Sequence, residues 1–226
     1  NDDEQILYYE GNIEDITQRK RAEEELKDSF ERLHKTLGAT VQALAVTAET
    51  RDPYTAGHQR RVADLSRAIA GAIGGLTTEQ IDGLRMASTI HDIGKISVPA
   101  EILSKPKKLT DIEFNLIKVH PQSGYDILKD IDFSWPIARM VLEHHERMDG
   151  SGYPNGLTGN ELLLESRIMA VADVVESMAS HRPYRPGLGI NAALDEIVKN
   201  KGVLYDPEVV DVCLKLFNEK GYKLVD

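Results

Sequence analysis

Apolar residues at helical spacing dominate this sequence from Leu37 to its end. Breaks rich in glycine and proline, such as Gly74-Gly75 and Lys105-Pro106, separate stretches that have the periodicity of amphipathic helices. These stretches are 37–50, 58–73, 78–91, 110–118, 121–129, 135–146, 166–180, 190–200 and 207–219. Convincing alternation of apolar and polar residues, which would indicate strands, is absent after residue 17. The pattern therefore predicts an all-α fold for the main body of the chain.

The first residues follow a different pattern. The segment from Ile6 to Thr17 begins like a β-strand and ends in polar turn residues, so we expect a short strand stub there. A stretch rich in helix formers follows, with nearly heptad apolar positions at Leu26, Phe30, Leu33, Leu37, Val41 and Leu44. This long helix could pack on its own domain or form a parallel coiled coil between two subunits. The many charges between Ala22 and Leu37 favour the coiled coil, and hence a homodimer.

Composition limits the partners that the chain can bind. Its 226 residues, 41% of them hydrophobic, suffice for one substantial domain plus an appendage. The net charge of −10 opposes binding to a nucleic acid polymer or an anionic membrane, and no apolar run is long enough to predict a membrane span. The start shows neither a leader peptide nor an initiator Met, so we expect a fragment of a longer protein. The lone Cys213 cannot form an internal disulfide, which fits the cytoplasm.

Histidines and aspartates stand where a metal site would need them. His91-Asp92 follows one predicted helix, His144-His145 ends another, and Asp173 lies inside an apolar run where a carboxylate is costly unless it is paired or bound to metal. Imidazole and carboxylate together are ligands of Fe, Mn or Zn. Each feature has a plainer explanation, since a His-Asp pair arises by chance and Asp173 could simply accept hydrogen bonds. Taken together, they predict a metal site.

Two long motifs carry a resemblance to a known family. The segments HDIGK at 91–95 and HHERMDGSGYP at 144–154 resemble the HD-GYP family of cyclic di-GMP phosphodiesterases. The flanking matches are RDPYTAGH at 51–58, His120-Pro121, Asp173 and RPYR at 182–185. The resemblance covers about residues 38–226 and implies the all-helical HD-superfamily bundle with added C-terminal helices. Residues 10–23 are similar to the end of a PAS sensor domain, which divides the chain into a PAS stub at 1–17, a linker helix at 18–37 and an HD-GYP domain at 38–226.

The resemblance also implies a ligand set. In HD phosphohydrolases the residues matching His58, His91, Asp92 and Asp173 hold a first ion, and Asp92 would bridge to a second ion held by His120 and the pair His144-His145. Which of that pair serves which ion stays open. Two ions can neutralise an anionic phosphodiester and lower the pKa of a bridging water, which gives a hydroxide nucleophile at neutral pH. We therefore expect two divalent ions, Fe or Mn, and hydrolysis of cyclic di-GMP to linear pGpG, with release of GMP left open.

Three cationic residues are candidates for holding the substrate. Lys95 lies three residues after Asp92 and could bind a non-bridging phosphate oxygen and stabilise developing charge, unless it is simply solvated. Arg182 and Arg185 belong to a proline-bracketed loop and could grip the distal phosphate or a guanine, because arginine offers a planar fork of donors. The Gly152-Tyr153-Pro154 segment is expected to shape the rim of the site rather than to bind metal.

One departure from the family pattern matters for metal number. Family members with a third iron carry a glutamate four residues before the first metal-binding His, and Tyr54 stands there in this chain. Two ions are therefore expected. The alternatives are a catalytically silent module that binds a nucleotide or a partner, and an HD-type nucleotidase for mononucleotides, which would not need His120 or the His144-His145 pair. In the family the Gly-Tyr-Pro segment is also associated with docking to GGDEF-type cyclase domains, which makes such a protein a candidate partner.

Overall fold

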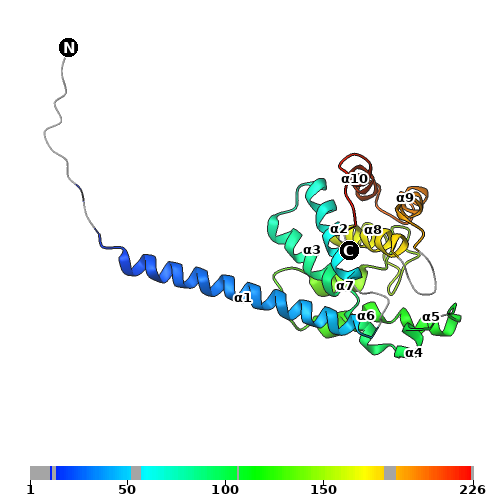
Figure 1. The fold of residues 1–226 in the computed structure, drawn as a ribbon, viewed down its shortest axis with the longest axis horizontal. Coiled ribbons are helices and arrows are strands. Elements are labelled where there is room, and N and C mark those ends of the chain that lie inside the picture. The colour runs from blue at the N-terminus through cyan, green and yellow to red at the C-terminus, as the bar shows by residue number, and fades with distance from the viewer. Residues whose placement is uncertain (1–10, 12–13, 52–56, 106, 181–186, 225–226) are drawn as a thin grey trace, which may run out of the picture. The chain divides into compact units, whose positions relative to one another are not determined.

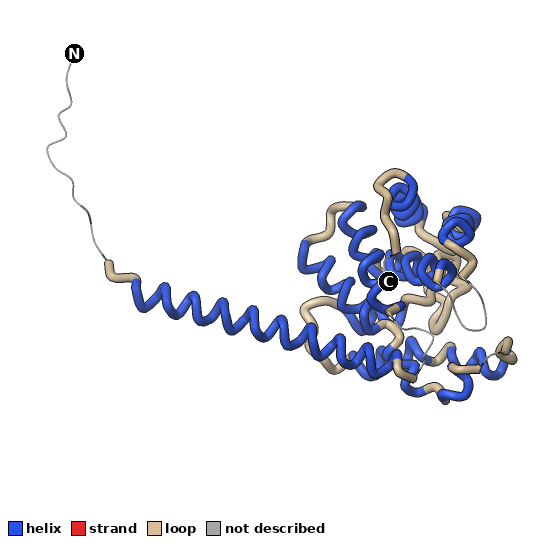
Figure 2. The backbone as a smooth tube through the Cα atoms, in the orientation of Figure 1, coloured by secondary structure: helices blue, strands red, loops and turns tan. Residues whose placement is uncertain are grey.

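The computed structural model describes residues 11, 14–51, 57–105, 107–180 and 187–224. Within these ranges the regular structure consists of helices, and no strand is present, as Figure 2 shows. The all-α prediction is therefore confirmed, whereas most of the predicted strand stub at 6–17 falls outside the described residues and the PAS resemblance at 10–23 stays a prediction. The chain divides into two compact units, Asn1–Ala39 and Thr40–Asp226, and each is described by itself.

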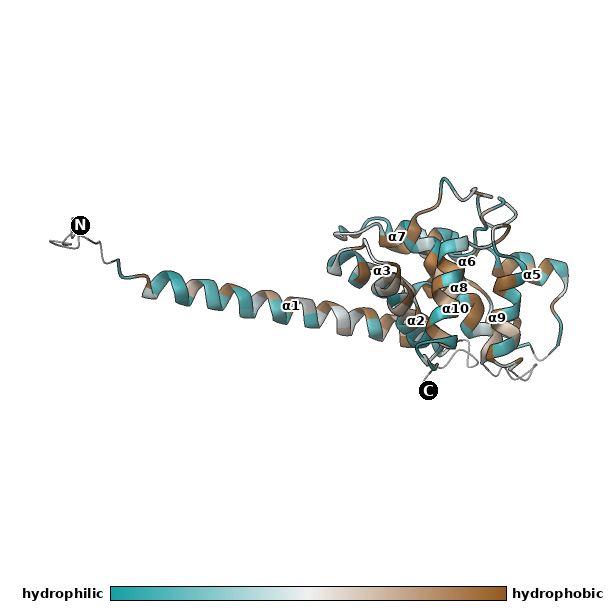
Figure 3. Cartoon of the chain, turned by 90° about the horizontal axis from the view of Figure 1, so that it is seen from above, coloured by the Kyte–Doolittle hydropathy of each residue, from teal (hydrophilic) through white to brown (hydrophobic). Residues whose placement is uncertain are grey.

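The first unit contains most of the long helix α1 (Thr17–Glu49). The predicted linker helix and the stretch that follows it form one continuous helix, which runs through Gly38 without a break. Figure 3 shows that the first part of this helix is mainly hydrophilic. Its apolar side chains are nevertheless exposed, with Leu26 at 72%, Phe30 at 60% and Leu33 at 66%. This stripe is therefore largely exposed within the unit.

Figure 1 shows the second unit as a helical bundle, and its buried apolar side chains form one core. Helix α2 (His58–Ile73) lies at its centre and packs against α3 (Thr78–Ile90), α8 (Leu164–Ala179) and α10 (Pro207–Asn218). Helix α7 (Ile137–Glu143) packs on α3 and α8, and α9 (Ile190–Lys199) packs on α8. The last turns of α1 contribute Val41, Ala45 and Ala48, whose spacing of four and three places them on one buried face.

Local sequence signals explain where several helices begin. Thr77 caps α3 by accepting from the amide of Gln80, whose side chain accepts from the Thr77 amide in return. Thr110 and Glu113 form the same reciprocal pair at the start of α5 (Asp111–Ile117). Asp206 caps α10 ahead of Pro207, which suits the first position of a helix because it needs no amide partner. These signals made the predicted boundaries accurate to within a few residues.

Two short helical segments were not predicted. They are the 3-10 helix η1 (Ile93–Ser97) and α4 (Ala100–Leu103), and η1 packs against α6 (His120–Leu128). A side chain at Gly94 would place its Cβ atom 1.9 Å from the His120 carbonyl oxygen, so only glycine permits this approach. Helix α5 differs from its neighbours because none of its residues is buried. Across the described part of the chain, no helix combines the length and the apolar character that crossing a membrane requires.

Candidate metal centre

The ends of four helices deliver histidines to one region of the second unit. His58 and His120 are the first residues of α2 and α6, whereas His91 and His144 directly follow α3 and α7. Asp173 comes instead from the middle of α8. All five side chains are buried, which is unusual for ionisable groups unless they are paired or bind metal. The fold therefore gathers residues that lie far apart in the sequence.

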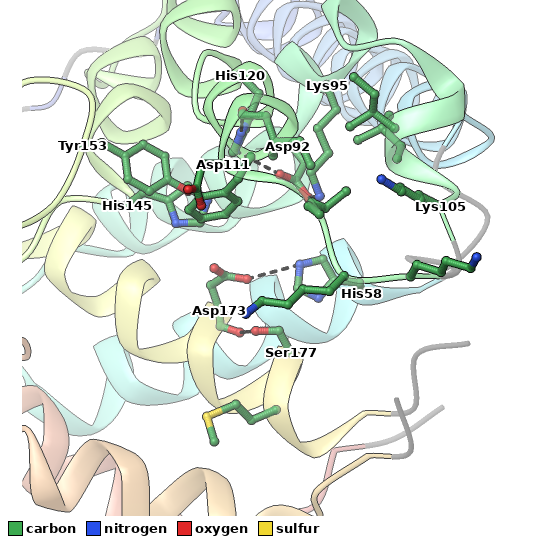
Figure 4. A pocket seen from close by; sticks show the side chains of 18 residues that line it. His58, Asp92, Lys95, Lys105, Asp111, His120, His145, Tyr153, Asp173 and Ser177 are labelled. Atoms are coloured by element: carbon green, nitrogen blue, oxygen red, sulfur yellow. Dashed lines mark hydrogen bonds and ion pairs between the residues drawn. The ribbon is translucent and has the colours of Figure 1, made fainter. Parts of the chain in front are cut away.

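The first group of possible ligands contains His58, His91 and Asp92, with one atom from each lying within 4.8 Å of the others. Asp173 faces the same group, because its Oδ1 atom is 3.2 Å from His58 Nε2 and 4.0 Å from His91 Nε2. Figure 4 shows Asp173 pointing towards His58 from the facing helix. Two imidazoles and two carboxylates thus converge, which is a donor set suited to Fe, Mn or Zn.

The second group contains His120, His144 and His145, again with one atom from each lying within 4.8 Å of the others. The Nε2 atoms of His120 and His144 are 3.2 Å apart, and the His144 and His145 ring centroids are 4.1 Å apart. Both members of the His144-His145 pair therefore face the ring of His120. Three imidazoles at this spacing are the ligand type that binds divalent transition metals.

Asp92 connects the two groups. Its Oδ1 atom lies 3.3 Å from His120 Nε2, and its Oδ2 atom lies 3.6 Å from His91 Nε2. The two carboxylate oxygens therefore face different histidine groups, which is the arrangement that a bridging carboxylate needs. Lys95 contacts the same carboxylate, with its Nζ atom 2.7 Å from Oδ2.

Three of the histidines are oriented by the same backbone contact. The Nδ1 atoms of His91, His120 and His144 lie 2.6–2.8 Å from the carbonyl oxygens of Ser88, Ile117 and Val141, each three residues earlier in the chain. A carbonyl oxygen can only accept, so Nδ1 carries the proton in each ring and Nε2 keeps its lone pair. Each Nε2 atom also faces another member of the cluster. The rings are therefore fixed in the tautomer that a metal ligand requires.

His58 obtains the same orientation from a carboxylate, Glu176, which the sequence analysis missed. Its Nδ1 atom donates to Glu176 Oε2, and the other oxygen of Glu176 accepts from Arg61 Nε at 2.7 Å and from Ser180 Oγ at 2.6 Å. Glu176 is buried, so this network is shielded from water. The sequence carries a weak signal for this role. Glu176 is an acidic residue in the same apolar run as Asp173, one turn further along α8.

The electrostatic environment favours ionised carboxylates and a neutral His120, whereas it holds His58 in the protonated form. Burial opposes ionisation of Asp92, but Lys95 and the neighbouring histidines outweigh it and hold the carboxyl pKa well below its usual range. The pKa of the Asp173 carboxyl is also held well below its usual range, because the hydrogen bond and the charge of His58 outweigh the effect of burial. Burial lowers the pKa of His120 to about 4. For His58, burial is outweighed by hydrogen bonds with Asp173 and Glu176, which raise its pKa to about 9. Ionised carboxylates beside a neutral His120 fit a divalent cation.

A pocket of about 890 Å³ opens over the cluster. His58, Asp92 and His120 are among the side chains that line it, and Figure 4 shows Lys95 beside Asp92. Tyr153 lines the pocket and stacks on His145, with ring centroids 4.7 Å apart. The volume suits a ligand much larger than a single phosphate group.

The loop that carries Tyr153 is held by a second buried glutamate that sequence reasoning left without a role. Glu146 accepts hydrogen bonds from the backbone amides of Asn155 at 2.7 Å and Leu157 at 3.1 Å. These contacts fix the segment that forms one wall of the pocket. Of the remaining candidates, Lys95 lies in the site, whereas Arg182, Arg185 and Tyr54 fall outside the described residues.

The chain matches the HD domain family over residues 42–209. It is 38% identical over 213 residues to the cyclic di-GMP phosphodiesterase response regulator RpfG of Xanthomonas campestris pv. campestris, covering 93% of this chain and 56% of that protein. It is 39% identical over 201 residues to a cyclic di-GMP phosphodiesterase of Thermotoga maritima, and this match covers 87% of this chain and 54% of that protein. The chain thus spans about half the length of these relatives. Its fold resembles Bd1817, an HDG"Y"P protein from Bdellovibrio bacteriovorus, with a TM-score of 0.61, 18% identity, and coverage of 71% of this chain and 51% of that one.

Proposed function

The chain belongs to the HD domain family, and from that premise we propose that it is a metal-dependent phosphodiesterase acting on cyclic di-GMP. The products would be linear pGpG and, if the second diester is also cut, GMP. The observation that carries the proposal is Asp92, whose two oxygens face two separate groups of buried histidines. The relatives named as cyclic di-GMP phosphodiesterases support the choice of substrate.

We assign two metal ions to this centre. One would be held by His58, His91, Asp92 and Asp173, and the other by Asp92 with the group His120, His144 and His145. The absence of a carboxylate at Tyr54 supports two ions rather than three. Nitrogen and carboxylate donors without thiolates are compatible with Fe or Mn. When bound, such ions supply charge neutralisation and an activated water nucleophile at neutral pH.

The protein's own residues would bind and orient the substrate. Asp92 positions both halves of the centre, and its pairing with Lys95 at 2.7 Å holds the ammonium beside the reacting phosphate. An ammonium has three donors, so Lys95 can hold Asp92 and still donate to a non-bridging phosphate oxygen. This donation would strengthen as negative charge develops in the transition state. Arg182 and Arg185 stay assigned to the remote phosphate or a base, by their place in the RPYR segment.

The N-terminal part is proposed to transmit a signal. A PAS sensor would precede the chain's linker helix, and the exposed stripe of Leu26, Phe30, Leu33 and Leu37 would join two copies in a coiled coil. Exposed leucines at heptad spacing on a charged helix support this pairing, because isolated helices rarely keep such a stripe in water. A GGDEF-domain protein is the further partner that we propose for the Tyr153 segment. The lone thiol, Cys213, supports the reducing cytoplasm as the compartment.

Metal analysis combined with a turnover assay tests the central proposal. The purified chain should contain about two Fe or Mn ions and should hydrolyse cyclic di-GMP. Asp92→Ala should lose both metal and turnover, because the proposed bridge serves both ions. Asp126→Ala is the matched control: Asp126 pairs with Lys129 at 2.9 Å with the same spacing of three residues, but on the surface.

Each alternative gives a different result. Full metal content in Asp92→Ala would contradict the bridging assignment. A metal-loaded wild-type chain that binds cyclic di-GMP without cleaving it would be a silent signalling module. Cleavage of mononucleotides alone would identify a nucleotidase.

A further inference from the structure

A metal centre acts on the phosphate and does not distinguish one base from another. A cyclic dinucleotide also carries two bases, which other parts of the pocket must contact. Two aromatic side chains line that pocket, Phe114 on α5 and Tyr153 on the loop after α7. Phe114 is 44% exposed, and α5 buries none of its residues, so this ring is not a core residue of its own helix.

One cation reaches both rings. The Nζ atom of Lys118, the residue that directly follows α5, lies 4.9 Å from the Phe114 ring centroid and 5.4 Å from the Tyr153 ring centroid. Among the described residues no carboxylate pairs with this ammonium, which differs from Lys95, paired with Asp92, and Lys105, paired with Glu113. Lys118 therefore keeps its hydrogen-bond donors available beside two aromatic faces.

The position of Tyr153 connects this cluster to the metal centre. Its ring stacks with an interplanar angle of 28° on His145, which is itself a member of the second histidine group. A base attached through its ribose to a phosphate at the centre would reach this wall of the pocket. The exposed ring of Phe114 offers a face on which such a base can stack, and stacking tolerates any base.

The ammonium adds a preference among bases. Guanine presents two acceptors, O6 and N7, on one edge, and lysine is a common partner of that pair. Adenine replaces O6 with an amino group that donates, so it cannot accept a hydrogen bond from an ammonium there. We propose that Lys118, Phe114 and Tyr153 form a guanine subsite, in which Lys118 selects guanine over adenine. This inference rests on the proposed cyclic dinucleotide substrate.

Lys118→Gln tests the selection directly. With Mn²⁺-loaded protein, kcat/KM is measured for cyclic di-GMP, for cyclic di-AMP and for bis(p-nitrophenyl) phosphate, a diester without a purine. We expect the preference for cyclic di-GMP over cyclic di-AMP to fall about tenfold, as for one lost base contact, while the small diester is cleaved at an unchanged rate. Lys129→Gln, which alters an exposed lysine paired with Asp126, should leave all three values unchanged.

A binding measurement separates this inference from the proposed activity. Saturation-transfer NMR with GMP and AMP, on wild-type protein stripped of metal, needs no turnover. We expect GMP to bind more tightly than AMP in the wild type and the two to bind alike in Lys118→Gln. Equal binding of GMP and AMP by the wild type would overturn the subsite. So would an unchanged base preference in Lys118→Gln. A fall in kcat/KM for bis(p-nitrophenyl) phosphate in that variant, equal to its fall for cyclic di-GMP, would overturn it as well. A wild type that prefers GMP but cleaves no cyclic dinucleotide would overturn the proposed activity alone.

Discussion

Each buried histidine of the metal centre uses Nδ1 for a protein partner and so leaves Nε2 available for a metal. Three of these partners are backbone carbonyl oxygens, but His58 donates to the carboxylate of Glu176. The carbonyl oxygens that His91, His120 and His144 use belong to the helices just before them, α3, α5 and α7, whereas His58 opens α2 and meets Glu176 on α8. A charged partner makes an imidazole a stronger donor, so Glu176 should influence the affinity of the first ion.

Glu176→Gln removes the charge while keeping an oxygen that can accept from His58 Nδ1. We expect metal affinity, measured by competition with a chelator, to fall about 10–100-fold. Asp206→Asn is a suitable control, because Asp206 is also buried and pairs with Arg167 at 2.5 Å but belongs to the cap of α10. Equal metal affinities for Glu176→Gln and wild type would mean that the other contacts alone hold His58.

The clustered histidines and aspartates, which we propose as ligands, could be singled out from the sequence, but Glu176 could not. His91-Asp92 and His144-His145 stand in long motifs, so each residue was visible without knowing the fold. The role of Glu176 depends on the packing of α2 against α8, which brings together residues 118 positions apart in the sequence. Tyr153 was expected at the rim, but its stacking on His145 likewise follows from packing.

At the level of elements, the site depends on how closely η1 approaches α6. This contact brings Asp92, just before η1, to the side of His120, the first residue of α6. The helices themselves followed from apolar spacing and capping residues, whereas η1 and α4 did not. Their turns are too short for a periodic pattern, and η1 is held in place by packing on its neighbour.

Gly94→Ala tests that close approach. The new Cβ atom would meet the His120 carbonyl oxygen and the Gly124 amide nitrogen, so η1 and α6 would have to move apart. We expect a loss of about 1–3 kcal/mol in unfolding free energy, as for other overpacked sites, together with weaker metal binding. Gly71→Ala is the control, because nothing lies within 4 Å of a Cβ at that helical position. It should stabilise the protein by roughly 0.5–1 kcal/mol. Equal unfolding midpoints in urea for the two variants would contradict the close contact.

The apolar stripe of α1 makes a prediction about oligomeric state. Leu33→Asp places a charge in the middle of the proposed seam, so the dimer should dissociate to monomer at micromolar concentration. Light scattering coupled to size exclusion gives the mass of each form. Lys35→Asp alters a charged residue that is not part of the stripe and should remain dimeric. If Leu33→Asp and wild type have the same mass, α1 does not join two subunits.

For the whole molecule, the second unit has a single core in which α10 packs against α2, α8 and α9. The metal centre lies on the same α2 and α8 helices, at His58 and Asp173. Metal binding should therefore stabilise the whole bundle, including α10, because a ligand that binds only the folded state favours it over the unfolded state. Cys213 in α10 offers a direct way to observe this coupling, since its side chain is completely buried.

The Cys213 thiol should react only when the bundle opens. Burial raises its pKa to about 12. In the folded state the thiol is therefore neither accessible to the reagent nor ionised to the thiolate at any pH up to 9. With Ellman's reagent at pH 8 we expect no prompt reaction of the native chain and one thiol per chain in guanidinium chloride. Mn²⁺ should slow native labelling relative to chelator-treated protein, and Asp92→Ala should abolish that difference. A Ser29→Cys variant, with the new thiol on the exposed part of α1, should label at once and confirm that the reagent is active. Prompt labelling of native Cys213 would show that α10 opens independently of the metal-binding helices.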